Sequence, residues 1–228
     1  MNIIITGCSK GIGLELAKLF CKDTDNFVIG ISRTKIEKSL IKELGNNSVF
    51  VPISYDLQNI TKDLYDKIFM EIKTVDVLIN NAGLLINKSF EELNDTDFDD
   101  MFNVNVKSVF KLIQMLLPHF SNNSHIVNIS SMGGFQGSAK FKGLSLYSSS
   151  KAALNILTEC MAEEFKEMNI KVNSLSLGAV DTEMLRLAFP GYKAQLNPIE
   201  MADYIKKFAE NSHHYMNGKI IPVSISTP

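Results

Sequence analysis

The sequence is poor in cysteine and has no long apolar run. Its 228 residues include three cysteines, Cys8, Cys21 and Cys160, whose odd number and wide spacing fit neither a disulfide framework nor a zinc motif. No apolar run reaches the ~18 residues of a membrane span. The first residues, 1–6, lack the cationic region and the longer apolar stretch of a signal peptide. These absences predict a cytoplasmic protein with free thiols, no bound metal and no membrane partner.

The charge balance argues against a further class of function. Charged residues make up 21% of the chain and hydrophobic residues 45%, and the formal net charge is -2. A general nucleic-acid-binding protein would carry a basic face or tail, so we expect no nucleic-acid partner. The composition is that of an ordinary soluble globular protein, and the length suits one large domain over residues 1–228.

Short β-branched runs alternate with longer helical patterns along the chain. Strands that alternate with helices form a parallel sheet with helices on both faces. The sequence therefore predicts a single doubly wound α/β domain with a seven-stranded parallel sheet. The expected strands are Asn2–Thr6, Asn26–Ser32, Ser48–Ser54, Val75–Asn80, Ser124–Ser130, Ile170–Leu177 and Lys219–Ser224. The expected helices are Gly11–Lys22, Lys35–Leu44, Ile60–Ile72, Thr96–Phe120, Leu144–Met168 and Pro198–Asn211.

Two segments carry additional signals. Asn94 and Asp95 are candidate caps of the long helix that follows them, and Pro118 marks the end of that helix. Residues 178–197 show no clear period between the sixth strand and the last helix. We expect this segment to be a mobile loop over a substrate site.

A glycine-rich turn directly follows the first strand. It reads Thr6-Gly7-Cys8-Ser9-Lys10-Gly11-Ile12-Gly13. Glycines there allow backbone conformations that are closed to other residues and a close approach to a pyrophosphate. The next helix directs its free N–H groups and the positive end of its dipole to the same place. The alternative is a purely structural turn, but the position before the first helix favours a dinucleotide-binding site.

The end of the second strand indicates which dinucleotide is bound. A NAD enzyme usually places a carboxylate there for the ribose 2′-OH. This chain instead has Ser32 and Arg33 at that point, and Lys10 stands within the glycine turn. Two cations suit the additional 2′-phosphate of NADP, although both could be ordinary solvated charges. We expect NADP (NADPH) as the cofactor, with NAD less favoured.

Tyr147 and Lys151 stand four positions apart in an expected helix, so their side chains share one face. At roughly 5 Å and an effective dielectric constant of about 20, a phenolate and an ammonium attract each other by about 3 kcal/mol, or roughly 2 pKa units. The pair predicts a Tyr147 pKa lowered toward neutrality, where a phenol exchanges protons with a carbonyl or an alcohol. Because Y-x-x-x-K is common on surface helices, the prediction depends on the other motifs.

The glycine turn, residues 80–83 (Asn-Asn-Ala-Gly), Ser131 and the Tyr147/Lys151 pair together resemble the short-chain dehydrogenase/reductase family. The resemblance covers the whole chain and implies a Rossmann-like fold and an NADP(H)-dependent oxidoreductase that interconverts a carbonyl and an alcohol. It implies that Tyr147 is the general acid and base, that Lys151 lowers its pKa and holds the nicotinamide ribose, and that Ser131 polarises the substrate carbonyl. Ser131 is preferred to Ser130 because a Met-Gly-Gly sequence follows it, as in the family.

The resemblance also implies a fourth catalytic residue and a set of cofactor contacts. Asn105 is expected to support a water-linked proton relay to Lys151; a buried amide that braces a helix is the alternative, and Asn103 is a competing candidate. The expected cofactor-binding residues are Gly7, Ser9, Lys10, Gly11, Ile12, Gly13, Ser32, Arg33, Asp56, Leu57, Asn81, Ala82, Gly83, Tyr147, Lys151, Gly178, Val180 and Thr182.

Three departures from the family pattern carry expectations of their own. Leu177 stands where the family has a proline, so the loop after it is expected to be less rigid. Ser131 and Tyr147 are 16 positions apart, more than is usual, and the extra length falls in residues 134–144. The tail, residues 224–228, lacks the usual Asp-Gly-Gly and is expected to alter oligomer contacts. The loop side chains expected to shape the pocket are Phe135, Gln136 and Phe141.

The substrate and the partners are less closely defined. Among family members, 3-oxoacyl-(acyl-carrier-protein) reductases are the nearest resemblance, which implies an acyl-thioester substrate. An acidic carrier protein would need a basic patch, and Lys140 and Lys142 are either part of it or lysines without a role. The alternative from another class is an NADP-binding sensor or scaffold without turnover. The apolar stripes of the helices at 96–120 and 144–168 either only cover the sheet or pair between subunits of a homodimer or homotetramer.

Overall fold

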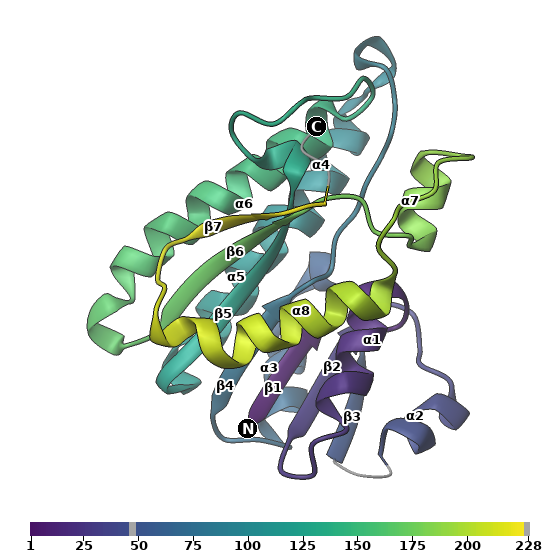
Figure 1. Ribbon diagram of the computed structural model, residues 1–228. Coiled ribbons are helices and arrows are strands. Elements are labelled where there is room, and N and C mark those ends of the chain that lie inside the picture. Colours follow the sequence, from purple (N-terminus) through teal and green to yellow (C-terminus); the bar gives the residue numbers. More distant parts are fainter. Residues whose placement is uncertain (46–48, 226–228) are drawn as a thin grey trace.

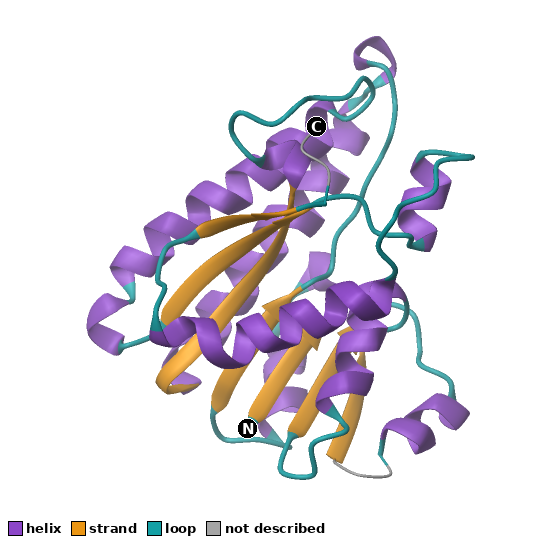
Figure 2. Ribbon diagram, viewed as in Figure 1, coloured by secondary structure: helices purple, strands orange, loops and turns teal. Residues whose placement is uncertain are grey.

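The computed structural model describes residues 1–45 and 49–225. It consists of one twisted sheet between two layers of helices (Figure 1, Figure 2). The strands are β1 (Asn2–Thr6), β2 (Phe27–Ser32), β3 (Val49–Ser54), β4 (Val75–Asn80), β5 (Phe120–Ser131), β6 (Lys171–Leu177) and β7 (Ile220–Val223). The α-helices are α1 (Gly11–Phe20), α2 (Lys38–Leu44), α3 (Lys62–Phe69), α4 (Asp95–Phe102), α5 (Ser108–Leu116), α6 (Ser145–Glu164), α7 (Glu183–Ala188) and α8 (Pro198–Asn211).

The seven strands form one parallel sheet in the order β3-β2-β1-β4-β5-β6-β7. Ile4 of β1 pairs with Ile29 of β2 on one side and with Leu78 of β4 on the other. The strand order therefore reverses direction between β1 and β4, and in open α/β sheets ligands bind beyond the carboxyl ends of the strands at such a switch point. The predicted fold class is confirmed.

Both faces of the sheet are covered, and the core has a part on each side. Successive side chains of a strand point to opposite faces, so Ile3 and Ile5 pack beneath α1 and α8, and Ile4 packs beneath α3, α5 and α6. All three side chains are fully buried. This arrangement explains why the strands read as continuous apolar runs in the sequence (Figure 1).

The long helix predicted at 96–120 is interrupted. Asn94 caps its beginning by accepting a hydrogen bond from the backbone N–H of Asp97, but after α4 the chain makes one π-helical turn, η3 (Asn103–Lys107), before α5 begins. Helix α5 ends at Leu116, and Pro118 lies in the short 3-10 turn that follows. The interruption coincides with Asn105, whose buried side chain bonds the backbone of a neighbouring loop rather than facing solvent.

The strand bounds differ from the prediction mainly at β5. This strand begins at Phe120 instead of Ser124 because Phe120 pairs with Val75 and the Ser121 hydroxyl bonds Asp76 of β4. The predicted beginning of the third strand, Ser48, lies outside the described residues, as do the last three residues of the tail. Among the residues that the structure describes, no helix is long and apolar enough to span a membrane.

Candidate active site

The glycine turn between β1 and α1 forms a cradle with room for a phosphate. Gly7 and Gly11 adopt φ angles of 71° and 59°, which L-residues other than glycine rarely occupy. A Cβ added at Gly7 would lie 2.9 Å from the Cα of Ala82. Helix α1 begins at Gly11 without a side-chain cap and has no acidic residue in its first turn. Its first N–H groups are therefore available to an anion, which fits the pyrophosphate of a dinucleotide.

The loop after β4 is joined to this turn by hydrogen bonds. The Thr6 hydroxyl accepts from the backbone N–H groups of Asn81 and Ala82, both at 3.0 Å. The Asn81 side-chain amide donates to the carbonyl oxygens of Thr6 at 3.0 Å and Gly7 at 3.2 Å. Asn81 therefore fixes the two sides of the switch point to each other.

Gly13 has a different role from the one predicted. It does not line the cavity; a Cβ at this position would collide with the Gly7 carbonyl oxygen and the side-chain amide of Asn81. Gly13 therefore allows α1 to pack closely on the turn, and its effect on a cofactor is indirect.

A single cavity of about 630 Å³ runs along the carboxyl ends of the strands. Apart from Gly13 and Asn105, it brings together all of the predicted site residues. Those that line it are Gly7, Ser9, Lys10, Gly11, Ile12, Ser32, Arg33, Asp56, Leu57, Asn81, Ala82, Gly83, Ser131, Tyr147, Lys151, Gly178, Val180 and Thr182. Of the three loop side chains expected to shape the pocket, Phe141 lines this cavity, whereas Phe135 and Gln136 line a separate surface hollow.

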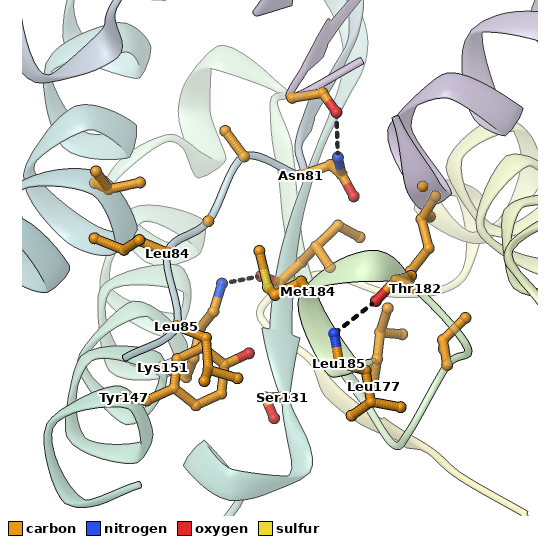
Figure 3. Close-up of a pocket in the computed structure, with 18 of the residues that line it drawn as sticks. Asn81, Leu84, Leu85, Ser131, Tyr147, Lys151, Leu177, Thr182, Met184 and Leu185 are labelled. Atoms are coloured by element: carbon orange, nitrogen blue, oxygen red, sulfur yellow. Dashed lines mark hydrogen bonds between the residues drawn. The ribbon is translucent and has the colours of Figure 1, made fainter. Parts of the chain in front are cut away.

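Ser131, Tyr147 and Lys151 meet where β5 ends against α6 (Figure 3). The side chains of Ser131 and Tyr147 line the same end of the cavity, and the Ser131 oxygen accepts a hydrogen bond from the Gly133 backbone N–H at 3.2 Å. The Lys151 side chain is buried, and its ammonium donates to the Ile129 carbonyl oxygen at 2.8 Å. Two hydroxyl groups and one ammonium thus converge on one end of the cavity.

The structure does not show the predicted lowering of the Tyr147 pKa by Lys151. Burial raises the pKa of Tyr147, and interaction with the Ser131 hydroxyl offsets only part of that rise. Burial also lowers the pKa of Lys151 to about 8. Removal from water disfavours the charged form of each group, and the ammonium is bonded to β5 instead of the phenol. The four-residue spacing of Tyr147 and Lys151 indicates a Coulomb attraction between them but not this desolvation.

Asn105 occupies the bracing position that was its alternative role. It is fully buried, and its side chain bonds both backbone groups of Leu84, at 2.8 Å and 2.9 Å, and the Ser150 hydroxyl at 2.9 Å. Ser150 directly precedes Lys151, so Asn105 ties the loop after β4 to α6 beside the lysine. The competing candidate, Asn103, is only partly buried at the start of η3.

The other end of the cavity carries exposed charge. Arg33 follows β2 and makes no ion pair with any residue that the structure describes. Lys10 pairs with Glu183, the first residue of α7, at 2.8 Å. Asp56 accepts a hydrogen bond from the Gln58 backbone N–H.

Sequence reasoning missed the wall that faces the catalytic groups. Helix α7 lies inside the segment 178–197, which was expected to be a loop, and places apolar side chains opposite Tyr147 (Figure 3). The apolar and aromatic residues that line this end are Leu84, Leu85, Met132, Leu144, Leu177, Met184, Leu185, Phe189 and Tyr192. The only signal for α7 was Thr182, whose hydroxyl caps the helix by accepting from the Leu185 N–H at 3.2 Å.

Comparisons with known proteins agree with this geometry. The family model described as short chain dehydrogenase matches residues 1–193. The chain is 30% identical to 3-oxoacyl-(acyl-carrier-protein) reductase of Thermotoga maritima, covering 96% of this chain and 94% of that protein. It is also 30% identical to 2-dehydro-3-deoxy-D-gluconate 5-dehydrogenase of Escherichia coli, covering 96% and 92%.

Solved structures place the fold in the same group. A short-chain dehydrogenase of Escherichia coli CFT073, complexed with NADPH, is 26% identical, with a TM-score of 0.84 and coverage of 97% of this chain and 95% of that one. A 4-hydroxyisoleucine dehydrogenase complexed with NADH is 25% identical, with a TM-score of 0.85 and coverage of 98% and 96%. Sequence motifs, sheet order and comparisons agree, and the chain belongs to the short-chain dehydrogenase/reductase family.

Proposed function

We propose that this chain is a cytoplasmic NADP(H)-dependent oxidoreductase that interconverts a carbonyl and an alcohol, with Tyr147 as its general acid and base. The observation that supports this most strongly is the shared cavity: the Ser131–Tyr147 hydroxyl pair and buried Lys151 lie at one end, and the glycine cradle lies at the other. A nicotinamide dinucleotide that bridged the two ends would supply the hydride; the chain's own groups supply orientation and the proton.

In the direction of reduction, the chain's groups have complementary tasks. A raised pKa keeps the Tyr147 phenol protonated at neutral pH, so it can donate a proton to the substrate carbonyl oxygen. Ser131 donates a hydrogen bond to the same oxygen and stabilises the charge that develops there. Lys151 would hold the nicotinamide ribose. Asn105 acts on Lys151 indirectly, through its bonds to Leu84 and Ser150.

The choice of NADP over NAD rests on charge at the adenosine end. Lys10 and Arg33 line the cavity there, and β2 ends in Ser32 with no carboxylate to accept a ribose 2′-OH. Cationic side chains suit the 2′-phosphate of NADP. The relative from Escherichia coli CFT073 was solved with NADPH, whereas 4-hydroxyisoleucine dehydrogenase was solved with NADH, so family membership alone does not decide the cofactor.

For the substrate, we propose a 3-oxoacyl thioester. The end of the cavity near Tyr147 is walled by Leu, Met and Phe side chains, and its only cation among the described lining residues is Lys151. An apolar acyl chain fits such a wall. A sugar acid, the substrate named for the Escherichia coli relative, would find no cation for its carboxylate there except Lys151, which we assign to the nicotinamide ribose. The Lys140 ammonium bonds the carbonyl oxygens of Phe135 and Ser138 in its own loop, so a carrier protein that used this lysine would have to compete with these two contacts.

The test is NADPH consumption with 3-oxoacyl thioesters of increasing chain length and with simple ketones, with NADH measured in parallel. We expect NADPH-dependent turnover that Tyr147→Phe abolishes and that Tyr215→Phe, a change at a tyrosine that is 85% exposed, leaves intact. No turnover over the range of thioesters would refute the acyl substrate. NADPH binding without oxidation by any substrate would instead favour a sensor or scaffold.

A further inference from the structure

Lys10 and Glu183 link the two sides of the cavity. The Lys10 Nζ and the Glu183 Oε2 are 2.8 Å apart, and the two side chains are 63% and 55% exposed. Lys10 belongs to the glycine turn, and Glu183 is the first residue of α7. These residues are 173 positions apart in the sequence, so the ion pair exists only because the fold brings α7 to the turn.

A second contact lies beside the ion pair. A Cβ added at Gly11 would be 3.6 Å from the Cγ2 of Thr182, which is ordinary van der Waals contact. Thr182 caps α7 immediately before Glu183. The beginning of α7 therefore lies next to the phosphate-binding turn, and the Lys10–Glu183 ion pair joins the two.

The two cations at the adenosine end differ in their ion-pair partners. Lys10 and Arg33 line the cavity there, and its carboxylates among the described lining residues are Asp56 and Glu183. The Asp56 carboxylate accepts a hydrogen bond from the Gln58 backbone N–H. Arg33 has no ion-pair partner in the part of the chain that the structure describes, whereas Lys10 is neutralised by Glu183, whose own pKa is lowered by that contact. One of the two cations suited to a 2′-phosphate is therefore engaged before the cofactor arrives.

We propose that Glu183 competes with the 2′-phosphate of NADP for Lys10, and that it thereby weakens the binding of NADP relative to NAD and helps to hold α7 on the glycine turn until the phosphate binds the lysine. This inference rests on the proposed use of NADP. An exposed pair between single charges contributes little, whereas a phosphate monoester carries about -1.5 to -2 charges and three strong acceptor oxygens. The exchange therefore favours the phosphate. NAD has no such group and leaves Lys10 on Glu183.

Binding of cofactor fragments tests this without turnover. The probes are 2′,5′-ADP, which carries the 2′-phosphate, and 5′-AMP, which does not, titrated into the wild-type protein and variants by calorimetry. We expect Glu183→Gln to tighten 2′,5′-ADP binding about threefold, the scale of an exposed ion pair, and to leave 5′-AMP binding unchanged. Lys10→Met should weaken 2′,5′-ADP binding about tenfold, as for the loss of one charge-assisted hydrogen bond. The matched control is Glu71→Gln, an exposed carboxylate after α3.

Hydrogen exchange of the α7 amides provides the second readout. In the wild-type protein, 2′,5′-ADP should accelerate their exchange and 5′-AMP should not; in Glu183→Gln the exchange should be fast without ligand. If Glu183→Gln changes neither 2′,5′-ADP binding nor α7 exchange while the wild-type protein prefers 2′,5′-ADP, the inference is wrong and the NADP assignment stands. If the wild-type protein binds 2′,5′-ADP no more tightly than 5′-AMP, both are wrong.

Discussion

The ammonium of Lys151 lies 6.0 Å from the centre of the Tyr147 ring, yet its hydrogen bond goes to the Ile129 carbonyl oxygen on β5. Both side chains project from the same face of α6, as four-residue spacing requires. Each is nevertheless biased toward its neutral form, because burial raises the pKa of Tyr147 and lowers the pKa of Lys151 to about 8. At neutral pH the Tyr147 phenol is therefore uncharged, and the Lys151 ammonium beside it loses its proton more easily than that of an exposed lysine.

This arrangement predicts that Tyr147 ionises late in the protein without cofactor. In an absorbance titration of the six tyrosines, replacing Tyr147 with Phe should remove a phenolate that forms at higher pH than an exposed tyrosine does, because its charged form is buried. If Tyr147→Phe instead removed a phenolate that forms at lower pH than that of an exposed tyrosine, the prediction would be wrong.

Lys151 should lower stability while it supports activity. Its folded pKa, about 8, lies below the 10.5 of an exposed lysine, so below pH 10.5 the unfolded chain binds the proton more tightly. Stability is lost as the pH falls from 10.5 to about 8 and stays lower below that. We expect Lys151→Met to abolish turnover and to raise the free energy of unfolding at pH 7 by up to about 3 kcal/mol, with the gain shrinking above pH 8. Urea denaturation at pH 7 and pH 10 measures this; a variant less stable than wild type at pH 7 would refute it.

Asn155, one helical turn beyond Lys151, should position the catalytic groups. Its amide donates to the Gly134 carbonyl oxygen at 3.2 Å, and its carbonyl oxygen accepts from the Ser174 hydroxyl at 2.8 Å. Gly134 lies so close to α6 that an added Cβ would be 2.6 Å from the backbone nitrogen of Ala152. Asn155 thereby holds the segment after Ser131 against α6.

Asn155→Ala should therefore affect chemistry more than cofactor binding. Loss of a buried, satisfied amide costs about 1–3 kcal/mol of stability, and a displaced Ser131 hydroxyl should lower kcat about tenfold or more with the NADPH Kd unchanged. Asn211→Ala, at the exposed end of α8, is the matched control. An unchanged kcat at a temperature where the variant is fully folded would leave Asn155 with a purely structural role.

Local signals in the sequence were sufficient for much of the fold and for the cofactor end of the site. The bounds of β1, β4 and α8 match those predicted, because continuous apolar strands and the Asn197-Pro198 helix start are encoded by neighbouring residues. The glycine turn was also predictable from the sequence, because the positive φ angles at positions 7 and 11 require glycine.

What the sequence left open depends on contacts between distant segments. The π-helical turn at η3 accompanies the bonds between Asn105 and Leu84, and no periodicity along the helix reports that contact. The pairing of Lys10 with Glu183 and the apolar wall of α7 likewise depend on where a six-residue helix packs. The direction of the Tyr147 pKa shift needed the burial of the side chain, which the spacing of two residues does not contain.

His125 should make the protein sensitive to acid. Its ring is fully buried between the Ala209 carbonyl oxygen and the Asn173 amide, and burial lowers its pKa from 6.5 to about 4. As the pH falls below 6.5, His125 binds a proton in the unfolded chain but not in the folded protein. The free energy of unfolding therefore falls between pH 6.5 and pH 4, by up to about 3 kcal/mol. His125→Gln should flatten this slope in urea denaturation at pH 7, 5.5 and 4.5. Equal slopes would show that other groups, such as nearby His213, dominate.

The exposed side of the α4, α5 and α6 layer predicts self-association. Phe98 on α4, Phe110 on α5 and Ile156 on α6 are 47%, 45% and 59% exposed, and large apolar side chains gathered on neighbouring helices mark interaction sites. We propose that a second copy covers them in a two-fold dimer or tetramer.

Light scattering should give a mass of two or four times the 25.4 kDa of one chain. Ile156→Glu would place a charge at the centre of a buried interface, where an unpaired carboxylate is strongly unfavourable, so this variant should shift to 25.4 kDa while keeping its circular dichroism spectrum. Met70→Glu introduces the same charge at an 82% exposed methionine after α3 and should leave the assembly intact. A wild-type protein that is monomeric at micromolar concentration would instead mean that the apolar stripes of these helices serve only to cover the sheet.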